Sequence, residues 1–396
     1  MTNSKYKSTI NACFIAYIVQ AIVNNFAPLL FITFQNEFNI PLSKITLLIT
    51  INFLIQLFID LLSAKFIDKI GYRASMVIAH IMCALGLSSL TFMPSLFGNA
   101  FLGLLIAVGI YAVGGGLLEV LVSPVVEACP TDNKEKAMSL LHSFYCWGQM
   151  GVVLLSTLFF ATLGINNWRF ITLVWAVVPF ANAFVFLKVP IASLNEEDET
   201  GMSITELCKN KMFWVLFVMM ICAGASEQGV SQWASAFAEK GLGVSKTVGD
   251  LAGPMAFAFL MGTSRVFYGK FGHKIELDKF MSFSSILCIA SYLVISLVPN
   301  SIVSLIGCAV CGLSVGIMWP GSFSKASAAL KRGGTVLFAL LALGGDVGCT
   351  VGPTVVGFVS GKFGDNMKMG ILFGTLFPLI LLAAIYVCKK MKLKED

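Results

Sequence analysis

Long apolar runs extend from one end of this chain to the other. Twelve of them approach or exceed the roughly 20 residues that an α-helix needs to cross the hydrocarbon core of a bilayer. Only 12% of the 396 residues are charged and 57% are hydrophobic, whereas a soluble domain carries about 25% charged residues. The solvent of this fold must therefore be largely lipid. The runs lie at about 9–35, 42–66, 74–94, 98–126, 136–162, 167–188, 211–238, 248–270, 279–298, 302–325, 334–361 and 367–388.

The basic residues indicate how the spans are oriented. With the N-terminus in the cytoplasm, 20 of the 27 Lys and Arg residues fall on the cytoplasmic side and six on the outer side, while Arg265 lies within a span. Cytoplasmic loops of membrane proteins carry such an excess of positive charge. We therefore predict an integral protein of the plasma (cytoplasmic) membrane with both termini in the cytoplasm.

The chain is expected to divide into two matching halves. A polar stretch at 189–210 follows the sixth span and separates residues 1–188 from residues 211–396. Three short motifs recur in the same order in both halves, at offsets of 201, 196 and 197 residues. This predicts an all-α membrane protein of twelve transmembrane helices in two six-helix pseudo-repeat bundles joined by a cytoplasmic linker. The recurring pairs are Gly71 with Gly272, Gly116 with Gly312, and Gly148 with Gly345.

The loop after the second span carries a recognisable pattern. Asp68-Lys-Ile-Gly-Tyr-Arg73 is similar to the signature Gly-x-x-x-Asp-Arg-x-Gly-Arg between spans two and three of the major facilitator superfamily, with Ala64 in place of the first Gly. The resemblance implies the major facilitator fold and transport by alternating access. We assign gating or inter-helix ion-pair roles at the cytoplasmic face to this loop and its neighbours, namely Asp60, Asp68, Lys69, Gly71, Arg73 and Arg265.

Four other stretches support a narrower resemblance. Gly114-Gly-Gly-Leu-Leu-Glu119-Val-Leu-Val-Ser123-Pro124 resembles the Gly-x-Leu-Glu-Thr-x-x-Asn-Pro segment of the fucose–galactose–glucose:proton symporter family. Val120 and Ser123 differ from that pattern, and span one offers amides but no acid. The resemblance implies proton-coupled sugar uptake. The other stretches are 141–144, 224–227 and 344–348.

Titratable groups inside the spans are candidates for proton coupling. A charge at bilayer depth costs at least ~2.5–3.5 kcal/mol, so such a group usually faces a cavity or a partner. Glu119 is the first candidate, because its release of a proton on one side of the membrane would change its affinity for a solute. Each group could instead have a structural role. Glu119 could form a hydrogen bond to a neighbouring helix, Asp346 could cap a helix broken by glycines, and His142 could be a hydrogen-bonded core residue. The four candidates are Glu119, Asp346, Glu227 and His142.

Amide and indole side chains near these groups are candidates for solute binding. Amides can bind hydroxyl groups, and an indole ring can stack on the C–H face of a sugar. Helix packing or a place in the interfacial aromatic belt is the alternative for each Trp. The candidates are Gln20, Asn24, Asn25, Trp147, Gln149, Gln228, Gln232, Trp233 and Trp319.

Several activities have no support in the sequence. No G-x-x-x-x-G-K-[ST] motif for ATP occurs, no H-E-x-x-H motif occurs, and the three histidines are too widely spaced for a metal site. We therefore expect no enzyme activity, no bound metal and no cofactor beyond a gradient of protons or another cation. The expected partners are a small-molecule solute and the lipid bilayer, without nucleic acid, and the expected state is a monomer.

The function predicted from the sequence is proton-coupled uptake of a sugar or similar small polar solute. Two alternatives remain open at this point. The first is proton-driven efflux of drugs or metabolites, which a site dominated by aromatic residues and Met would favour. The second is a membrane-embedded enzyme or receptor without transport, which would need a catalytic constellation.

Overall fold

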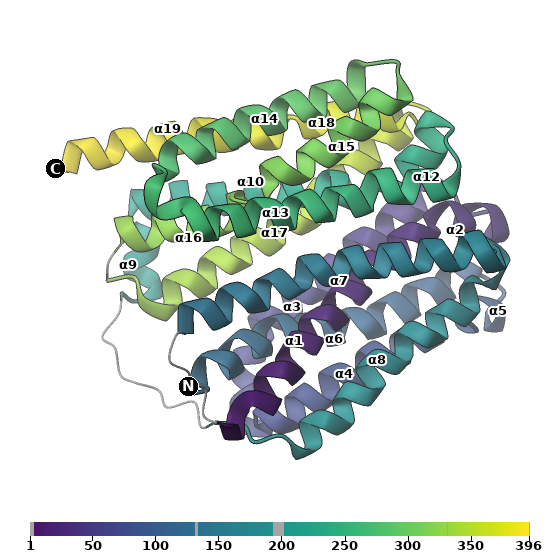
Figure 1. The fold of residues 1–396 in the computed structure, drawn as a ribbon, viewed down its shortest axis with the longest axis horizontal. Coiled ribbons are helices and arrows are strands. Elements are labelled where there is room, and N and C mark those ends of the chain that lie inside the picture. The colour runs from purple at the N-terminus through teal and green to yellow at the C-terminus, as the bar shows by residue number, and fades with distance from the viewer. Residues whose placement is uncertain (1–3, 131–133, 193–201, 331, 396) are drawn as a thin grey trace. The chain divides into compact units, whose positions relative to one another are not determined.

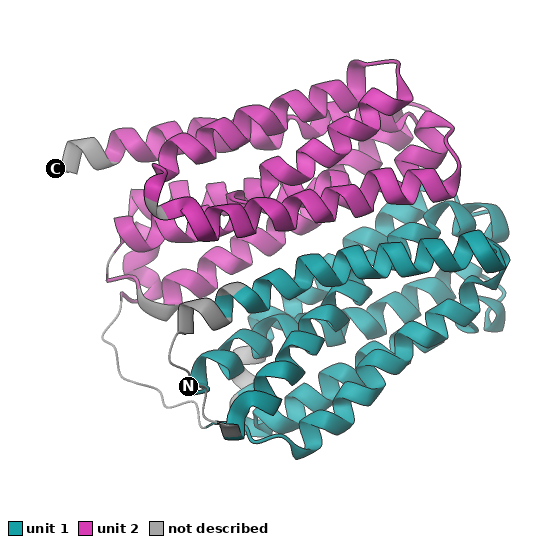
Figure 2. Cartoon of the chain, viewed as in Figure 1, with its two compact units in different colours: residues 1–196 teal, residues 197–396 magenta. Residues whose placement is uncertain are grey.

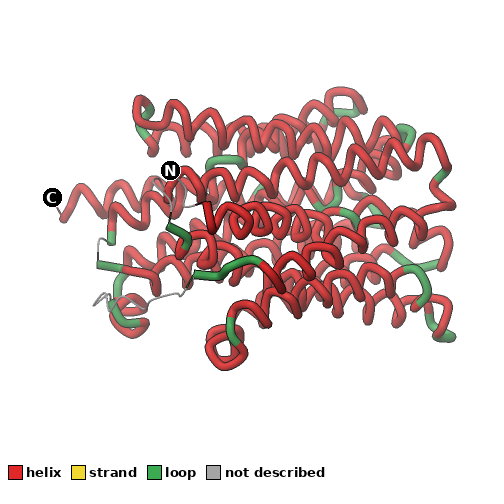
Figure 3. The backbone as a smooth tube through the Cα atoms, turned by 60° about the horizontal axis from the view of Figure 1, so that its bottom comes forward, coloured by secondary structure: helices red, strands yellow, loops and turns green. Residues whose placement is uncertain are grey.

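The chain forms two compact helical units. A computed structural model describes residues 4–130, 134–192, 202–330 and 332–395. Helices account for most of this described part, in which no strand occurs (Figure 3). The units comprise Met1–Glu196 and Glu197–Asp396 (Figure 2), and long helices make up each of them (Figure 1).

The first unit contains mostly uninterrupted helices. Its first span is divided, because α1 ends at Asn25 and a 3₁₀ turn at Ala27–Leu30 leads into α2. A short helix, α5, follows the third span. The elements are α1 (Lys7–Asn25), α2 (Phe31–Phe38), α3 (Leu42–Ile70), α4 (Tyr72–Leu90), α5 (Met93–Leu96), α6 (Ala100–Ala128), α7 (Lys134–Leu163) and α8 (Trp168–Lys188).

The second unit contains more interrupted helices. Two π-helical turns, η4 (Phe237–Gly241) and η5 (Leu251–Met255), lie in its first two spans. The other elements are α9 (Ile204–Lys209), α10 (Lys211–Ser231), α11 (Ala234–Ala236), α12 (Lys246–Asp250), α13 (Ala256–Phe271), α14 (Leu277–Leu297), α15 (Ser301–Val315), α16 (Met318–Ala329), α17 (Gly334–Lys362), α18 (Met367–Gly374) and α19 (Leu376–Glu395).

Eleven helical segments in the described part of the chain are long and apolar enough to cross a membrane. The eighth expected span, 248–270, is not among them, because the π-helical turn η5 leaves α13 with only 16 residues. Pro254 lies inside that turn and cannot donate a backbone hydrogen bond. The chain still runs helically from Lys246 to Phe271, so the twelfth crossing is a helix with a π-bulge.

Asparagine and glycine residues lie at the beginnings and ends of several helices. Asn39 and Gly71 adopt positive φ angles of 52° and 86° at the ends of α2 and α3, a conformation that Gly and Asn tolerate best. Asn99 caps α6 by accepting a hydrogen bond from the Phe101 N–H. Asn300 caps α15 in the same way.

The boundary between the units falls within the polar stretch 189–210, of which 193–201 lie outside the described residues. The short helix α9 begins with a capping box, in which Ser203 and Glu206 exchange side-chain-to-backbone hydrogen bonds. The hydrogen bond from the Ser203 backbone N–H lowers the pKa of Glu206. The Met202 N–H also donates to the Arg332 carbonyl oxygen, so this segment is attached to the loop before α17.

Glycines bring α10 and α17 into direct backbone contact in the second unit. A Cβ atom added to Gly348 would lie 2.0 Å from the Ile221 carbonyl oxygen, and one added to Gly352 would lie 2.4 Å from the Ala225 carbonyl oxygen. No other residue type allows so close an approach, which is typical of helix pairs in membranes.

Candidate functional site

Three consecutive glycines on α6 let this helix approach two neighbours in the first unit. A Cβ atom added to Gly114 would lie 2.5 Å from the Ala79 carbonyl oxygen of α4, and one added to Gly116 would lie 3.0 Å from the Gln56 Cα of α3. Because both contacts involve backbone atoms, the space cannot be gained by moving a side chain. Glu119 follows Gly116 by three residues, so this close packing fixes the position of its carboxyl group.

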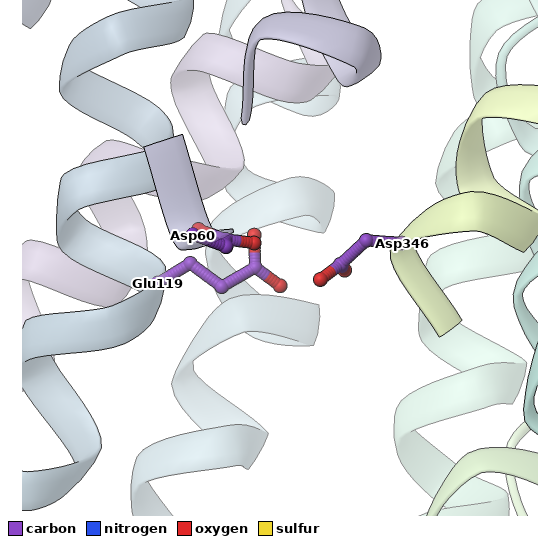
Figure 4. A group of neighbouring side chains, drawn as sticks. All are labelled: Asp60, Glu119 and Asp346. Atoms are coloured by element: carbon purple, nitrogen blue, oxygen red, sulfur yellow. The ribbon is translucent and has the colours of Figure 1, made fainter. Parts of the chain in front are cut away.

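Glu119 lies among polar side chains from two other helices. The Gln20 amide of α1 donates a 3.0 Å hydrogen bond to Glu119 Oε2, and a carboxylate oxygen of Asp60 on α3 lies within 4.8 Å of one on Glu119 (Figure 4). We expected Asp60 to act in gating or in an inter-helix ion pair at the cytoplasmic face. It lies beside Glu119, ten residues before α3 ends. Two carboxylates at this distance repel each other when both are ionised.

Three buried amides form a layer one helical turn away from these acids. Gln56 Nε2 donates hydrogen bonds of 2.8 Å to Asn24 Oδ1 and 3.1 Å to Asn52 Oδ1. All three side chains are at most 5% exposed. Asn52, Gln56 and Asp60 follow at intervals of four residues and therefore line one face of α3. The sequence reasoning missed Asn52 and Gln56, although this spacing was visible.

Other polar side chains of the first unit also contact one another. The hydroxyl groups of Tyr17 and Ser123 lie 2.9 Å apart, and Asn25 Nδ2 donates to the Tyr145 hydroxyl at 3.3 Å. His142 is exposed, and its ring meets the Tyr17 ring edge-on at 5.4 Å. Two other candidates on α7 are the buried Gln149 and the half-buried Trp147.

A second histidine, not identified from the sequence, lies in the core of the first unit. His80 on α4 is fully buried. Its Nδ1 lies 2.7 Å from the Met76 carbonyl oxygen, and its Nε2 lies 2.8 Å from Asn182 Nδ2 on α8. The carbonyl can only accept, so Nδ1 carries the proton and Nε2 accepts from Asn182. The Asn182 amide also donates to the Ala12 carbonyl oxygen, which links α1, α4 and α8.

An ion pair joins two helices of the second unit. The Arg265 guanidinium on α13 lies 3.2 Å from Glu227 Oε2 on α10. Arg265 Nε also donates to the Gly316 carbonyl oxygen at 3.3 Å, at the break between α15 and α16. We expected Arg265 to act in gating or in an inter-helix ion pair at the cytoplasmic face. An ion pair between helices is present. The partner, Glu227, lies near the middle of a span, where each charge compensates the other.

Polar side chains continue along α10 from Glu227. Gln228 donates to Glu227 Oε1 at 3.3 Å, and Gln232 donates to Gln228 Oε1 at 3.0 Å. Trp233 is fully buried, and its indole N–H donates to the Pro353 carbonyl oxygen of α17 at 2.9 Å. This burial and the hydrogen bond within the second unit favour the packing alternative for Trp233.

The Trp319 ring of α16 lies directly on the backbone of α17. A Cβ atom added to Gly345 would lie 2.1 Å from the Trp319 ring. Asp346 is the next residue, and Figure 4 shows its carboxyl group projecting from α17. It is 8% exposed, and its backbone carbonyl accepts a 3.0 Å hydrogen bond from the Thr350 hydroxyl. Trp319 thus contacts the residue that precedes Asp346 on α17.

The signature loop of the first unit is held by hydrogen bonds to α8. The Arg73 guanidinium donates to the Phe186 and Leu187 carbonyl oxygens at 2.8 and 3.0 Å, which satisfies groups left open at a helix C-terminus. Lys69 is exposed, and the Asp68 side chain lies outside the described residues. An open depression of about 720 Å³ borders the loop and is lined in part by Gly71, Arg73 and Leu187.

These features define a class of protein. Each unit is a bundle of membrane-crossing helices with polar or charged side chains buried inside it, an arrangement that serves solute and ion pathways. The comparison with protein families agrees. Residues 12–353 match the model of the Major Facilitator Superfamily, and the chain belongs to this superfamily of membrane transporters. It is accordingly classed with transporters rather than enzymes.

Individual relatives are more distant. The membrane protein MosC of Rhizobium meliloti is 25% identical over 266 residues, which make up 66% of this chain and 62% of MosC. The matched part of the chain thus spans less than two thirds of this curated relative.

Solved structures of similar fold cover nearly the whole chain. A bacterial homologue of the human lysosomal transporter Spinster has a TM-score of 0.74 at 14% identity and covers 100% of this chain and 99% of its own. A D-xylose–proton symporter has a TM-score of 0.73 at 15% identity, covering 96% and 97%. The Escherichia coli fucose:proton symporter FucP has a TM-score of 0.66 at 15% identity, covering 97% and 99%. These likenesses show the fold.

Proposed function

We propose that this protein is a secondary active transporter that takes up a sugar or similar small polar solute together with protons. The observation that carries the proposal is the cluster of Glu119, Asp60 and Gln20 inside the first unit. The names of two proteins with similar folds, a fucose:proton and a D-xylose–proton symporter, support the same solute class. The proposed cycle is alternating access, which needs no cofactor beyond the ion gradient.

The cluster has the chemistry that proton coupling requires. Two neighbouring, half-buried carboxyl groups are more stable when they hold one proton between them than when both are ionised. The Gln20 amide donates to Glu119 in its ionised form, and after rotation its carbonyl oxygen can accept from the protonated acid. A change in water access to the pair would therefore load and release a proton without leaving Gln20 unsatisfied.

Transport into liposomes tests this assignment. Purified protein is reconstituted, labelled hexoses and pentoses are added outside, and an inward proton gradient is imposed. We expect wild type to accumulate at least one sugar only while the gradient is present. Glu119→Gln should lose this accumulation yet still exchange labelled for unlabelled sugar, because its binding site and its conformational cycle remain.

Glu127→Gln is the matched control, since Glu127 is an exposed acid on the same helix, α6. It should accumulate sugar as wild type does. Accumulation by Glu119→Gln at the wild-type level would refute the coupling role. Accumulation driven by sodium alone would replace the proton with another cation, and export of solute in the same vesicles would favour the efflux alternative.

The same proposal includes the location of the protein. We place it in the cytoplasmic membrane as a monomer with both termini inside the cell. The support is the distribution of Lys and Arg, of which 20 among 27 fall on the inner side in this orientation.

A further inference from the structure

We propose that the second unit binds the headgroup of an anionic phospholipid where α10 begins and α19 ends, through a basic cluster of four lysines. The cluster consists of Lys209, Lys211, Lys389 and Lys390. It lies at the end of the unit that we place at the cytoplasmic face. The inference concerns the lipid that surrounds the protein, and it holds whatever solute is carried.

The two helices contact each other at this end. The Cys388 thiol of α19 lies 3.6 Å from the Met212 sulfur of α10, and both side chains are buried. Lys211 directly precedes Met212, and Lys389 directly follows Cys388. Because a helix rises about 1.5 Å per residue, one lysine of each helix lies close to the level of this sulfur contact. The other two lysines come one or two residues further along the chain, so the four gather at one place.

The charges of the basic cluster are available to a ligand. All four side chains are exposed, and none of them forms an ion pair with an acid in the described part of the chain. Glu206 of α9 is already engaged, because its Oε2 accepts from the Ser203 N–H and hydroxyl at 2.8 and 3.2 Å. Those hydrogen bonds chiefly lower the pKa of Glu206, and the charges of Arg332 and Lys209 add to the effect. A positive surface therefore remains.

Two aromatic side chains lie on the membrane side of the lysines. Trp214 follows Met212 by two residues on α10, and Tyr386 precedes Cys388 by two on α19, so both lie about 3 Å further into the membrane. They are 49% and 68% exposed. The Trp214 indole N–H donates to the Cys208 carbonyl oxygen at 2.8 Å, which fixes its ring. Exposed Trp and Tyr side chains gather at the level of lipid headgroups, and the lysines therefore lie at the level of the phosphates.

This arrangement matches one class of lipid. A phospholipid with a net negative headgroup brings its phosphate to the ammonium groups and its acyl chains to the aromatic rings below them. Each Lys near an anionic leaflet contributes an attraction equivalent to about 5-fold in binding. A zwitterionic lipid carries an ammonium group of its own beside the phosphate, so it gains less from the basic cluster. The site should therefore select anionic over zwitterionic phospholipids.

Fluorescence quenching by brominated lipids tests the inference. Purified protein is reconstituted into phosphatidylcholine vesicles, in which a rising fraction of the lipid is replaced by brominated phosphatidylglycerol or brominated phosphatidylcholine. The signal of Trp214 is the difference between each protein and the same protein carrying Trp214→Phe. We expect phosphatidylglycerol to quench Trp214 at about 5-fold lower fraction than phosphatidylcholine. This ratio should fall toward one at high salt, which screens exposed charges.

Two double variants locate the effect. Lys211→Gln combined with Lys389→Gln should bring the ratio close to one, because it removes one charge from each helix. Lys188→Gln combined with Lys274→Gln is the matched control, since both are exposed lysines expected on the same side of the membrane but outside the basic cluster. It should keep the wild-type ratio. All four positions are exposed, and thermal unfolding of each variant checks that the fold is retained.

Three results would overturn the inference. The first is equal quenching of wild type by the two brominated lipids. The second is a wild-type ratio in the Lys211 and Lys389 double variant. The third is an equal loss in the control variant, which would assign the preference to the charge of the whole face. None of these results bears on solute transport, so the proposed function stands or falls separately. Because both leaflets of the vesicles hold the same lipid, the result does not depend on the orientation of the chain.

Discussion

Arg265 and Glu227 carry opposite charges inside the second unit, and each reduces the cost of burying the other. The Arg265 side chain is 18% exposed and the Glu227 side chain 10%, with 3.2 Å between nitrogen and oxygen. An isolated charge in this position would be expensive, whereas a hydrogen-bonded pair is tolerated. Glu227 is therefore less suited to release a proton than its position in a span suggests, and Glu119 remains the leading candidate for coupling.

The ion pair predicts a strong dependence of stability on both partners. Arg265→Gln leaves the Glu227 charge without its partner and should lower the unfolding free energy by about 3–5 kcal/mol. Glu227→Gln should be similarly damaging, whereas the double variant should lose less than the sum of the two single losses. Thermal unfolding in detergent, followed for the four proteins, measures this difference. Strict additivity of the single effects would show that the pair contributes no coupling energy.

Glycine contacts determine how α10 and α17 pack at the scale of whole helices. Gly348→Ala would force a methyl group against the Ile221 carbonyl oxygen, which lies 2.0 Å from the ideal Cβ position. Because the obstacle is backbone, the helices must separate, and we expect a loss of about 1–3 kcal/mol in unfolding free energy. Gly361→Ala on the same helix meets no atom within 4 Å and should unfold at the wild-type temperature. Equal unfolding temperatures for the two variants would contradict this account.

Interrupted helices also distinguish the two units. The second unit has π-helical turns at Phe237–Gly241 and Leu251–Met255 and a break at 316–317. Irregular backbone at bilayer depth must be satisfied by neighbouring groups, and Arg265 does this for the Gly316 carbonyl. The hydropathy pattern cannot indicate such breaks, because π-bulges and helix breaks contain the same apolar residues as regular helix.

At the scale of the whole molecule, chemical labelling of one cysteine can show how the chain is oriented in the membrane. Among the eleven cysteines, all of them in the described residues, Cys208 is exposed, Cys349 is intermediate and nine are buried. Cys208 lies on α9 in the segment between the units, which we place in the cytoplasm. A charged maleimide that does not cross membranes should therefore label the protein only after the cells are permeabilised.

Two variants complete the labelling experiment. Cys208→Ser should abolish the labelling seen in permeabilised cells. Lys240→Cys in that background places a thiol at an exposed position of the π-helical turn η4, on the side expected outside, so it should be labelled in intact cells. Labelling of Cys208 in intact cells would reverse the proposed orientation of the protein.

The sequence was sufficient for the class of the protein but not for the partners of its polar side chains. Span length and composition predicted an all-α membrane protein. The resemblance of the loop at Asp68–Arg73 implied the major facilitator type, which the family match confirms. The approach of Asp60 to Glu119 and the pairing of Arg265 with Glu227 depend on the rotation of each helix about its axis. Membrane helices that are apolar on all sides give little indication of that rotation. The burial of Trp233 was missed for the same reason.

The direct backbone contact between α10 and α17 has a mechanical consequence. No layer of movable side chains separates the two helices where Gly348 and Gly352 meet Ile221 and Ala225, so neither helix can slide along the other without a collision of main-chain atoms. The two helices must therefore move together as one rigid body whenever the second unit changes conformation. Bending is then left to the places where regular hydrogen bonding already stops, above all at residues 316–317, next to Trp319.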